Sequence, residues 1–331
     1  MLVAKNQTGK IVNLLEELPE TGDFVCPACG GAVVLKNGPV KRAHFAHVAL
    51  KECHAWAENE SAQHLGLKAQ LYQWFVASGC HVEVEYYLPE LLQTPDLLVD
   101  GHLAIEVQCS RLSVARLRER TENYKRHGYT VLWLMGHDLW LKHTLAPLQR
   151  ELLYFSGNAG FYFWELDLEK EQLRLKSLIH ENLRRQVIYV TRAFSFGRGN
   201  LLDVLRTPFA RRQLMSLEST IDRRFRAFIS QQLYHKNPYW MRVQEIYYLQ
   251  GRNLVTEEFG TVQWAPPGLD LLTHARETAF CQLSQDLSAL TNYYDAFLRY
   301  YSQNPQRKLY PPSFYGKMDE WSKLTKKNQI P

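Results

Sequence analysis

The sequence lacks the features of membrane-spanning, secreted and disordered proteins. No uninterrupted apolar run approaches the roughly 18 residues that a membrane-spanning helix needs. The first stretch, MLVAKNQTGKIVNLL, contains two lysines and no apolar run long enough for a signal peptide. Internal repeats and low-complexity segments are also missing. We therefore expect a cytoplasmic protein with no membrane partner.

The sequence also has few cysteines and a small net charge. There are six cysteines among 331 residues, and in the cytoplasm such thiols are free or bind metal more often than they form disulfides. Basic residues outnumber acidic ones by 39 to 34, a net charge of +5, which favours an acidic partner only mildly. A hydrophobic content of 46% with 22% charged residues is typical of a folded globular protein with room for two or three domains.

The chain divides into three segments of different character. Residues 1–57 are turn-rich and predict a small zinc-finger-like domain. Residues 58–150 show the order helix, three strands, helix, strand. Residues 151–331 combine a hairpin at 161–179 with mainly helical sequence rich in arginine and aromatic residues. The sequence therefore predicts an α/β (α+β) fold with a zinc-knuckle N-terminal domain, an αβββαβ core and a mainly helical C-terminal domain.

A cysteine knuckle is the strongest local motif. In CPACGG, Cys26 and Cys29 direct two thiolates at one point, and Zn²⁺ then needs two more ligands. Three candidates follow: His44, His47 and Cys53. If 43–48 is a strand, the two histidines face opposite sides. We favour Cys26, Cys29, His47 and Cys53 as a structural zinc site, with His44 as the alternative for either later ligand; the competing interpretation is a reduced cysteine pair in a turn.

Polar side chains interrupt two apolar strands in TPDLLVDGHLAIEVQCSRLS, residues 94–113. Glu106 and Gln108 are two residues apart and project from one face of a strand, so Ile105 and Val107 face the core. Carboxylates and an amide on adjoining strands are typical of an Mg²⁺ site for phosphodiester hydrolysis. Asp96 on the neighbouring strand is the expected second carboxylate.

The length of the turn decides whether Asp96 and Glu106 share a face. A two-residue turn at Asp100-Gly101 would point Asp96 away from Glu106. A three-residue loop, 99–101 with Gly101 in the left-handed region, would make Asp96 oppose Ala104 and share the face of Glu106. We predict the three-residue loop.

The preceding helix carries a polar stripe. Glu60, His64 and Lys68 are spaced at i, i+4 and i+8 and therefore lie on one helix face. Such a stripe is often a solvated face with a stabilising Glu–Lys arrangement. Because it opens the helix–strand unit that holds the acids, we interpret it as part of a catalytic site.

Several motifs together resemble the competence protein CoiA family: CPACG, HFAH, Cys53, the helix with Glu60, Ser61, His64 and Lys68, IEVQCS and the ERTENY helix. The resemblance covers roughly the first 140 residues. The αβββαβ order is similar to the PD-(D/E)XK nuclease core, whose pattern maps onto Pro95-Asp96 and Glu106-Val107-Gln108. The resemblance to the CoiA family implies a cytosolic protein that processes incoming DNA during natural transformation, at or near the recombination step.

The resemblance also implies roles for the acidic residues. Asp96 and Glu106 would hold Mg²⁺ or Mn²⁺, Glu60 would bind a water or a second metal, and Gln108 would orient the nucleophile. Gln108 stands where the superfamily usually has lysine, and an amide supplies no positive charge. Lys68 is our candidate to supply it from the helix.

A second departure lies in the following helix. Nucleases of the superfamily often carry Gln-x3-Tyr there, and this chain has Arg120-x3-Tyr124. We expect both side chains to contact DNA phosphate. Farther along, residues 184–252 hold 13 basic and 4 acidic residues, which fits a DNA backbone as well as it fits solvated helix faces.

The motifs favour a metal-dependent DNA nuclease acting in competence and recombination. The first alternative is a non-enzymatic DNA-binding adaptor that keeps the nuclease fold and assists a recombinase. A weaker alternative is an interaction module whose zinc domain recruits protein.

Overall fold

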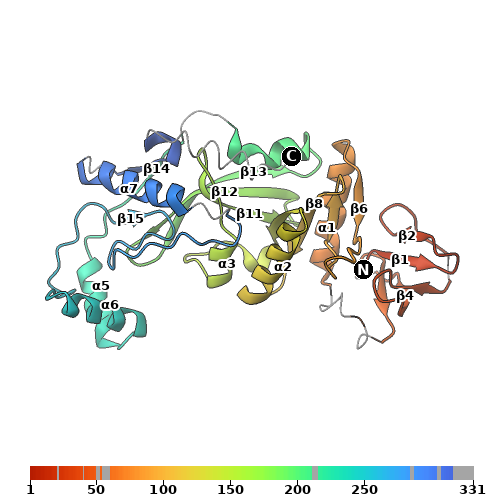
Figure 1. Cartoon of the computed structure of the whole chain (residues 1–331), viewed down its shortest axis with the longest axis horizontal. Coiled ribbons are helices and arrows are strands. Elements are labelled where there is room, and N and C mark those ends of the chain that lie inside the picture. The colour runs from red at the N-terminus through yellow and green to blue at the C-terminus, as the bar shows by residue number, and fades with distance from the viewer. Residues whose placement is uncertain are drawn as a thin grey trace.

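The computed structural model describes residues 1–20, 22–39, 41–49, 53, 60–210, 215–283, 287–303 and 307–315. It is a mixed α/β protein with two substantial sheets, one at the N-terminus and one through the centre of the molecule (Figure 1). None of the helices in this described part combines the length and apolar character that a bilayer crossing would need.

The N-terminal sheet has five strands: β1 (Val3–Asn6), β2 (Ile11–Asn13), β3 (Phe24–Val25), β4 (Ala32–Lys36) and β5 (His44–His47). They pair antiparallel in the order β2-β1-β3-β4-β5. The core beneath them is small and includes Phe24, Phe45 and the two cysteines Cys26 and Cys53. A core of this size needs an additional cross-link, such as a disulfide or a bound metal ion, to be stable.

The central unit follows the predicted order of elements. Helix α1 (Ala62–Ala77) is followed by β6 (Val82–Val84), β7 (Leu97–Val99), β8 (Leu103–Gln108), α2 (Val114–Arg126) and β9 (Thr130–Met135). Both helices begin at serines whose hydroxyls accept a backbone N–H, Ser61 from His64 and Ser113 from Arg116. The prediction of helix, three strands, helix, strand is thus confirmed.

The two helices cover opposite faces of this sheet. Leu97, Ile105 and Val107 pack in one cluster with the apolar side of α1. Leu98 and Ala104 pack in a second cluster with residues of α2 and the C-terminal part of the chain. Ile105 and Val107 therefore face a core, as expected, and the face that carries Glu106 is also covered.

The central sheet continues beyond β9. Strand β11 (Gly160–Asp167) runs parallel to β9, and β12 (Gln172–Asn182) and β13 (Val187–Ser195) extend the sheet to the order β13-β12-β11-β9-β8-β7-β6. Two short strands, β10 (Tyr154–Ser156) and β15 (Trp264–Ala265), complete nine. The hairpin expected at 161–179 is present as β11 and β12.

This continuity corrects the boundary placed at residue 150. Residue 150 lies in α3 (Pro147–Glu151), between two strands that pair within one sheet. Every residue of β11 is buried, which marks it as a central strand and not as the start of a separate domain. Among the described residues, the mainly helical character begins only after β13.

The C-terminal helices form two groups. Helix α7 (Leu287–Gln303) packs on the central sheet through Tyr293, Tyr294 and Phe297. Helices α5 (Phe225–Tyr234) and α6 (Pro238–Leu249) pack on each other around a small core of their own. Short elements connect these parts: α4 (Leu201–Leu205), η2 (His137–Leu139), η3 (Thr207–Phe209), η4 (Pro312–Tyr315), and the pair β14 (Leu217–Glu218) and β16 (Lys308–Leu309).

Candidate functional site

The cysteine knuckle is a tight turn closed by its own backbone. The N–H of Cys26 donates to the carbonyl of Gly31 at 2.8 Å, and the N–H of Gly30 donates to the carbonyl of Cys26 at 2.9 Å. Gly30 has a φ of +71°, a left-handed conformation that glycine adopts without steric cost. The turn brings Cys29 Sγ to 3.5 Å from His47 Nε2 on β5.

Four of the predicted zinc ligands meet at this turn. The ligand atoms of Cys26, Cys29, His47 and Cys53 all lie within 4.8 Å of one another, a spacing and donor set that fit one tetrahedral Zn²⁺. The alternative ligand His44 instead places Nδ1 2.9 Å from the carbonyl of Arg42. Burial raises the pKa of Cys26 to about 12, so Cys26 loses its proton at neutral pH only when a bound cation stabilises the thiolate.

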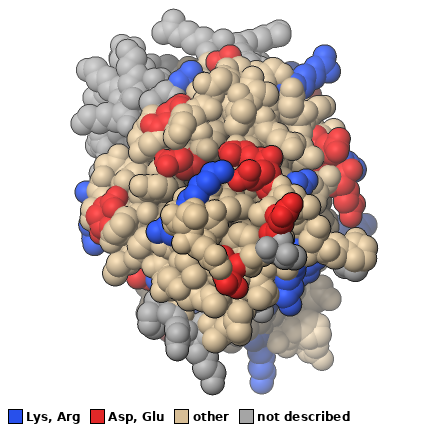
Figure 2. Space-filling model, turned by 90° about the vertical axis from the view of Figure 1, so that its right-hand side faces the viewer, with Lys and Arg blue, Asp and Glu red and all other residues tan. Residues whose placement is uncertain are grey.

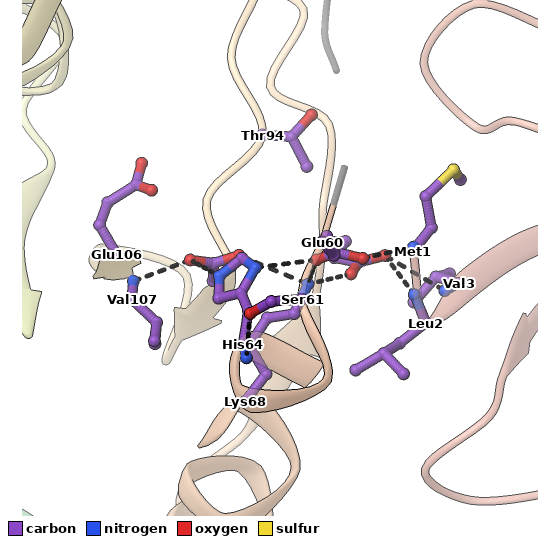
Figure 3. A network of polar contacts seen from close by, with 12 residues as sticks. Met1, Leu2, Val3, Glu60, Ser61, His64, Lys68, Thr94, Glu106 and Val107 are labelled. Carbon is purple, nitrogen blue, oxygen red and sulfur yellow. Dashed lines mark hydrogen bonds and ion pairs between the residues drawn. The ribbon is translucent and has the colours of Figure 1, made fainter. Parts of the chain in front are cut away.

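A second cluster surrounds Lys68, which is completely buried. Its ammonium forms ion pairs with the carboxylates of Glu60 and Glu85 and lies 3.4 Å from Asp96 Oδ1. Figure 3 shows His64 and Lys68 on α1 and Glu60 just before it, with Glu60 next to Met1 at the N-terminus. These carboxylates raise the pKa of Lys68 despite its burial, so Lys68 is charged.

His64 connects two of these acids. Its Nε2 lies 3.1 Å from Asp96 Oδ2, and its Nδ1 lies 3.3 Å from Glu60 Oε1. Burial lowers the pKa of His64, but the two carboxylates outweigh that effect and raise the pKa to about 9. In the absence of a competing cation, His64 is therefore protonated at neutral pH.

The cluster is balanced in charge. Glu60 also forms an ion pair with the amine of Met1, which donates to the carbonyl of Phe45 at 3.2 Å. Burial alone would raise the pKa of Glu60 and Asp96, but Lys68 and His64 lower it in both cases. Three cationic groups thus face three carboxylates, which is the condition under which buried charges are tolerated.

The hairpin that carries Asp96 has a three-residue loop, but not the predicted one. Leu97 pairs with Ile105 and Val99 pairs with Leu103, so the loop is 100–102. Asp100 and Gly101 both have positive φ, 48° and 71°, and the N–H of His102 donates to the carbonyl of Val99. Two consecutive left-handed residues begin the loop one residue later than expected.

In this register Ala104 pairs with Leu98 and not with Asp96, which lies just before β7. A shift of two residues leaves side-chain alternation unchanged, but the two carboxylates meet different helices: Asp96 contacts α1 and Glu106 contacts α2. Asp96 Oδ2 also accepts the N–H of Val107 at 2.8 Å, which fixes the carboxylate against β8.

Glu106 makes its own contacts, apart from Lys68. Its carboxylate forms an ion pair with Arg120 and accepts the hydroxyl of Tyr124 at 2.7 Å. Burial raises the pKa of Glu106 although Arg120 opposes the change. Figure 3 shows the Glu106 carboxylate turned away from His64 and Lys68.

Arg120 and Tyr124 therefore hold Glu106 in this structure. Tyr124 is completely buried, and Arg120 also donates to the carbonyl of Thr94 at 3.4 Å. Gln108, at the end of β8, donates its amide to the carbonyl of Ser110 at 3.0 Å. The Tyr124 hydroxyl and the Arg120 guanidinium are both engaged with Glu106, while the Arg120 side chain remains 21% exposed.

The described residues contain a second group that could hold a cation, formed by Glu60, His64 and Asp96. Their ligand atoms all lie within 4.8 Å of one another. Two carboxylates and an imidazole suit Mn²⁺ better than Mg²⁺, which prefers oxygen ligands and retained water. His64 becomes a ligand only after it loses its proton.

Sequence reasoning missed Glu85, the third carboxylate around Lys68. It follows β6 in the alternating stretch CHVEVEYYL, where Glu83 and Glu85 read as one solvated strand face. One feature of the sequence could have pointed to Glu85: the stretch directly follows the helix whose polar stripe contains a lysine. Only the fold shows that this carboxylate is 4% exposed and meets that lysine.

Two arginines at the ends of the basic segment 184–252 take part in packing. Arg184 forms an ion pair with Asp222 at 2.5 Å and stacks over Phe228. Arg252 pairs with Glu257 at 2.6 Å and stacks over Tyr247. These two arginines therefore pack against aromatic side chains of the C-terminal part, as the interpretation of the segment as helix surface expects.

The face of the molecule at the N-terminal sheet is mixed in charge. Figure 2 shows acidic and basic side chains side by side there. Within the N-terminal segment, Lys10 and Glu17 form an ion pair with side chains 67% and 53% exposed. The described residues of this face form no uniformly basic surface.

Two family models match the chain. Competence protein CoiA, N-terminal domain, matches residues 9–56, and Competence protein CoiA, nuclease-like domain, matches residues 60–208. The nuclease-like match thus extends past residue 150, as the central sheet does.

One curated relative and the solved structures complete the comparison. Competence protein CoiA of Bacillus subtilis (strain 168) is 38% identical over 126 residues. The alignment covers 37% of this chain and 34% of the relative, so the match spans about a third of the relative's length. No solved structure gives a significant match.

Proposed function

Because the chain belongs to the competence protein CoiA family and has its nuclease-like domain, we propose that it is a metal-dependent deoxyribonuclease. In this proposal it acts in the cytoplasm on DNA taken up during natural transformation, with a recombinase as a further partner. The αβββαβ order supports a PD-(D/E)XK core. In the same proposal, the N-terminal sheet of the chain is stabilised by one structural Zn²⁺ bound by Cys26, Cys29, His47 and Cys53.

The observation that carries the proposal is the position of Asp96. It contacts His64 and Lys68 of α1 on one side and accepts the N–H of Val107, the residue after Glu106 on β8, on the other. Asp96 would hold Mn²⁺ or Mg²⁺ together with Glu60 and His64, or with Glu106 if that carboxylate leaves Arg120. A bound divalent cation supplies an activated water and neutralises negative charge on the phosphate.

Other residues of the chain prepare the site for this chemistry. Lys68, 3.4 Å from Asp96 Oδ1, supplies the positive charge that Gln108 cannot. Gln108 can both donate to and accept from a water, which suits it to orient the nucleophile. We assign Arg120 and Tyr124 to positioning Glu106, in place of the phosphate contact expected from the sequence.

The adaptor alternative has a specific observation in its favour. Lys68, Asp96 and Glu106 are at most 8% exposed, and their charges are already paired within the protein. A family member that had lost catalysis could keep such a cluster for stability alone. In that case DNA would bind and stay intact.

A cleavage panel tests the proposal. Single-stranded, duplex and branched DNA are incubated with the protein and Mg²⁺ or Mn²⁺, alongside Asp96→Asn and the matched control Asp138→Asn, whose side chain is 79% exposed. We expect cleavage by the wild type and the control, reduced in Asp96→Asn by about 10–100-fold or more. Binding without cleavage of any substrate would establish the adaptor instead, and no binding would favour the protein-recruitment module.

A further inference from the structure

Glu85 combines a strained backbone with a buried charge. It directly follows β6 and has a φ of 50°, a left-handed conformation that is unfavourable for a residue with a Cβ. Its side chain is 1% exposed. A buried carboxylate on a strained backbone persists only where the surrounding structure fixes it. Glu85 is not among the residues proposed to hold a cation, so its position needs another explanation.

Four contacts fix Glu85, and they lead in two directions. Toward the acidic cluster, its N–H donates to the carbonyl of Asp96 at 3.1 Å, and its Oε1 pairs with Lys68. Toward the N-terminal sheet, its Oε2 accepts the N–H of Leu2 at 2.7 Å and of Val3 at 3.2 Å. One carboxylate therefore bridges the ammonium of α1 and the backbone of β1.

The N-terminal sheet connects this bridge to the cysteine knuckle. In β1, Lys5 pairs with Val25, the residue before Cys26. The N–H of Phe45, on the strand that ends at His47, donates to the carbonyl of Met1 at 2.8 Å. The strand that reaches Glu85 is thus held by the two segments that bear three of the four knuckle ligands.

We propose that Glu85 is a positioning residue that holds Lys68 beside Asp96 and couples the cysteine knuckle to the cation-binding cluster. This inference rests on the proposed function for the cluster. A carboxylate is required because both its oxygens face donors, the Lys68 ammonium on one side and two N–H groups on the other. An amide would turn its own N–H groups toward one of them.

Mn²⁺ affinity tests the positioning role without relying on cleavage. Mn²⁺ is titrated into the full chain, into Glu85→Gln, and into the matched variant Glu83→Gln, which removes the same charge two residues earlier on β6. We expect Glu85→Gln to weaken Mn²⁺ binding by about 10–100-fold, the usual effect of losing a partner behind metal ligands. Glu83→Gln should bind like the wild type; equal affinity of Glu85→Gln and the wild type would overturn the proposal.

A double-mutant cycle tests the coupling to the knuckle. Cys29→Ser removes an exposed knuckle ligand far along the chain from Glu85. If Glu85 transmits the effect, Cys29→Ser also weakens Mn²⁺ binding, and adding it to Glu85→Gln causes little further loss. Unchanged Mn²⁺ affinity in Cys29→Ser, or full additivity of the two losses, would refute the coupling.

If Glu85→Gln does not fold, or if Mn²⁺ does not bind, hydrogen exchange of the wild type tests the positioning role of Glu85. The amides of Leu2, Val3 and Val107 all donate to carboxylates of this cluster, so we expect them to share one opening reaction and similar protection. Exchange of Leu2 and Val3 at the unprotected rate would contradict the role of Glu85. Mn²⁺ binding without DNA cleavage would refute the nuclease proposal and leave this one standing.

Discussion

Lys68 is surrounded by three carboxylates, and this arrangement explains why acids lie in strands that are otherwise apolar. The polar stripe of Glu60, His64 and Lys68 was predictable from helical spacing alone. Its interpretation as a solvated face is wrong, since Lys68 is completely buried. Breaking a buried ion pair by removing one partner typically costs about 3–5 kcal/mol, so loss of a single charge from the stripe should destabilise the fold.

Another buried residue, His180, predicts how stability depends on pH. Burial lowers its pKa from 6.5 to about 4, its Nδ1 lies 2.9 Å from the carbonyl of Leu178, and its ring packs on Phe297. The folded protein keeps His180 neutral while the unfolded chain protonates it. The free energy of unfolding should therefore be highest above pH 6.5 and fall by about 3 kcal/mol as pH drops to 4.

Urea unfolding between pH 4 and 7 measures this dependence. His180→Phe should flatten the decline in that range, because the group that titrates is gone. His81→Gln, at an exposed position, serves as the control and should keep the wild-type slope. A decline of equal steepness in His180→Phe would show that other groups cause it.

Residue-level prediction failed where a contact depends on distant chain segments. The pairing of Glu106 with Arg120 and Tyr124 joins β8 to α2, and no spacing rule distinguishes that use of an arginine from a phosphate contact. Glu85 was missed for the same reason: its partners are on α1 and β1. By contrast, the four knuckle ligands followed from a local motif, because their geometry is set within a few short turns.

At the scale of elements, local patterns predicted the order of helices and strands but not the details of turns. Serine caps and apolar periodicity place α1 and α2, and the odd-length loop after β7 was expected from the need for a shared face. Its position was off by one residue, because both Asp100 and Gly101 adopt positive φ. Aspartate tolerates that conformation, so glycine alone did not mark where the loop begins.

The N-terminal sheet leads to a prediction about zinc. Its core is small, so its stability should depend on the metal. We expect the purified protein to contain one zinc per chain, as measured by mass spectrometry of metal content, and Cys26→Ser to lose it together with protection of β1 and β4 amides.

Cys80→Ser is the matched control, since Cys80 lies outside the group of knuckle ligands. It should keep its zinc and its N-terminal sheet. A wild-type protein with a well-protected N-terminal sheet and no zinc would contradict the structural role of the metal.

At the scale of the whole molecule, a single sheet extends from the candidate site into the segment assigned to another domain. The sequence could not show this, because the run GFYFW at the start of the strand has no alternation of apolar and polar residues that would indicate how it lies in a sheet. Parallel pairing of β9 with β11 joins segments across α3, a contact that only the fold defines. The cluster around Asp96 is consequently supported by a nine-stranded sheet.

The most direct test of the central claim, that Asp96 belongs to a cation-binding site, is Mn²⁺ binding followed by electron paramagnetic resonance. The wild type and Asp138→Asn should each bind one Mn²⁺ per chain in addition to zinc. Asp96→Asn should bind it about 10–100-fold more weakly while remaining folded by circular dichroism. Wild-type affinity in a folded Asp96→Asn variant would contradict the claim.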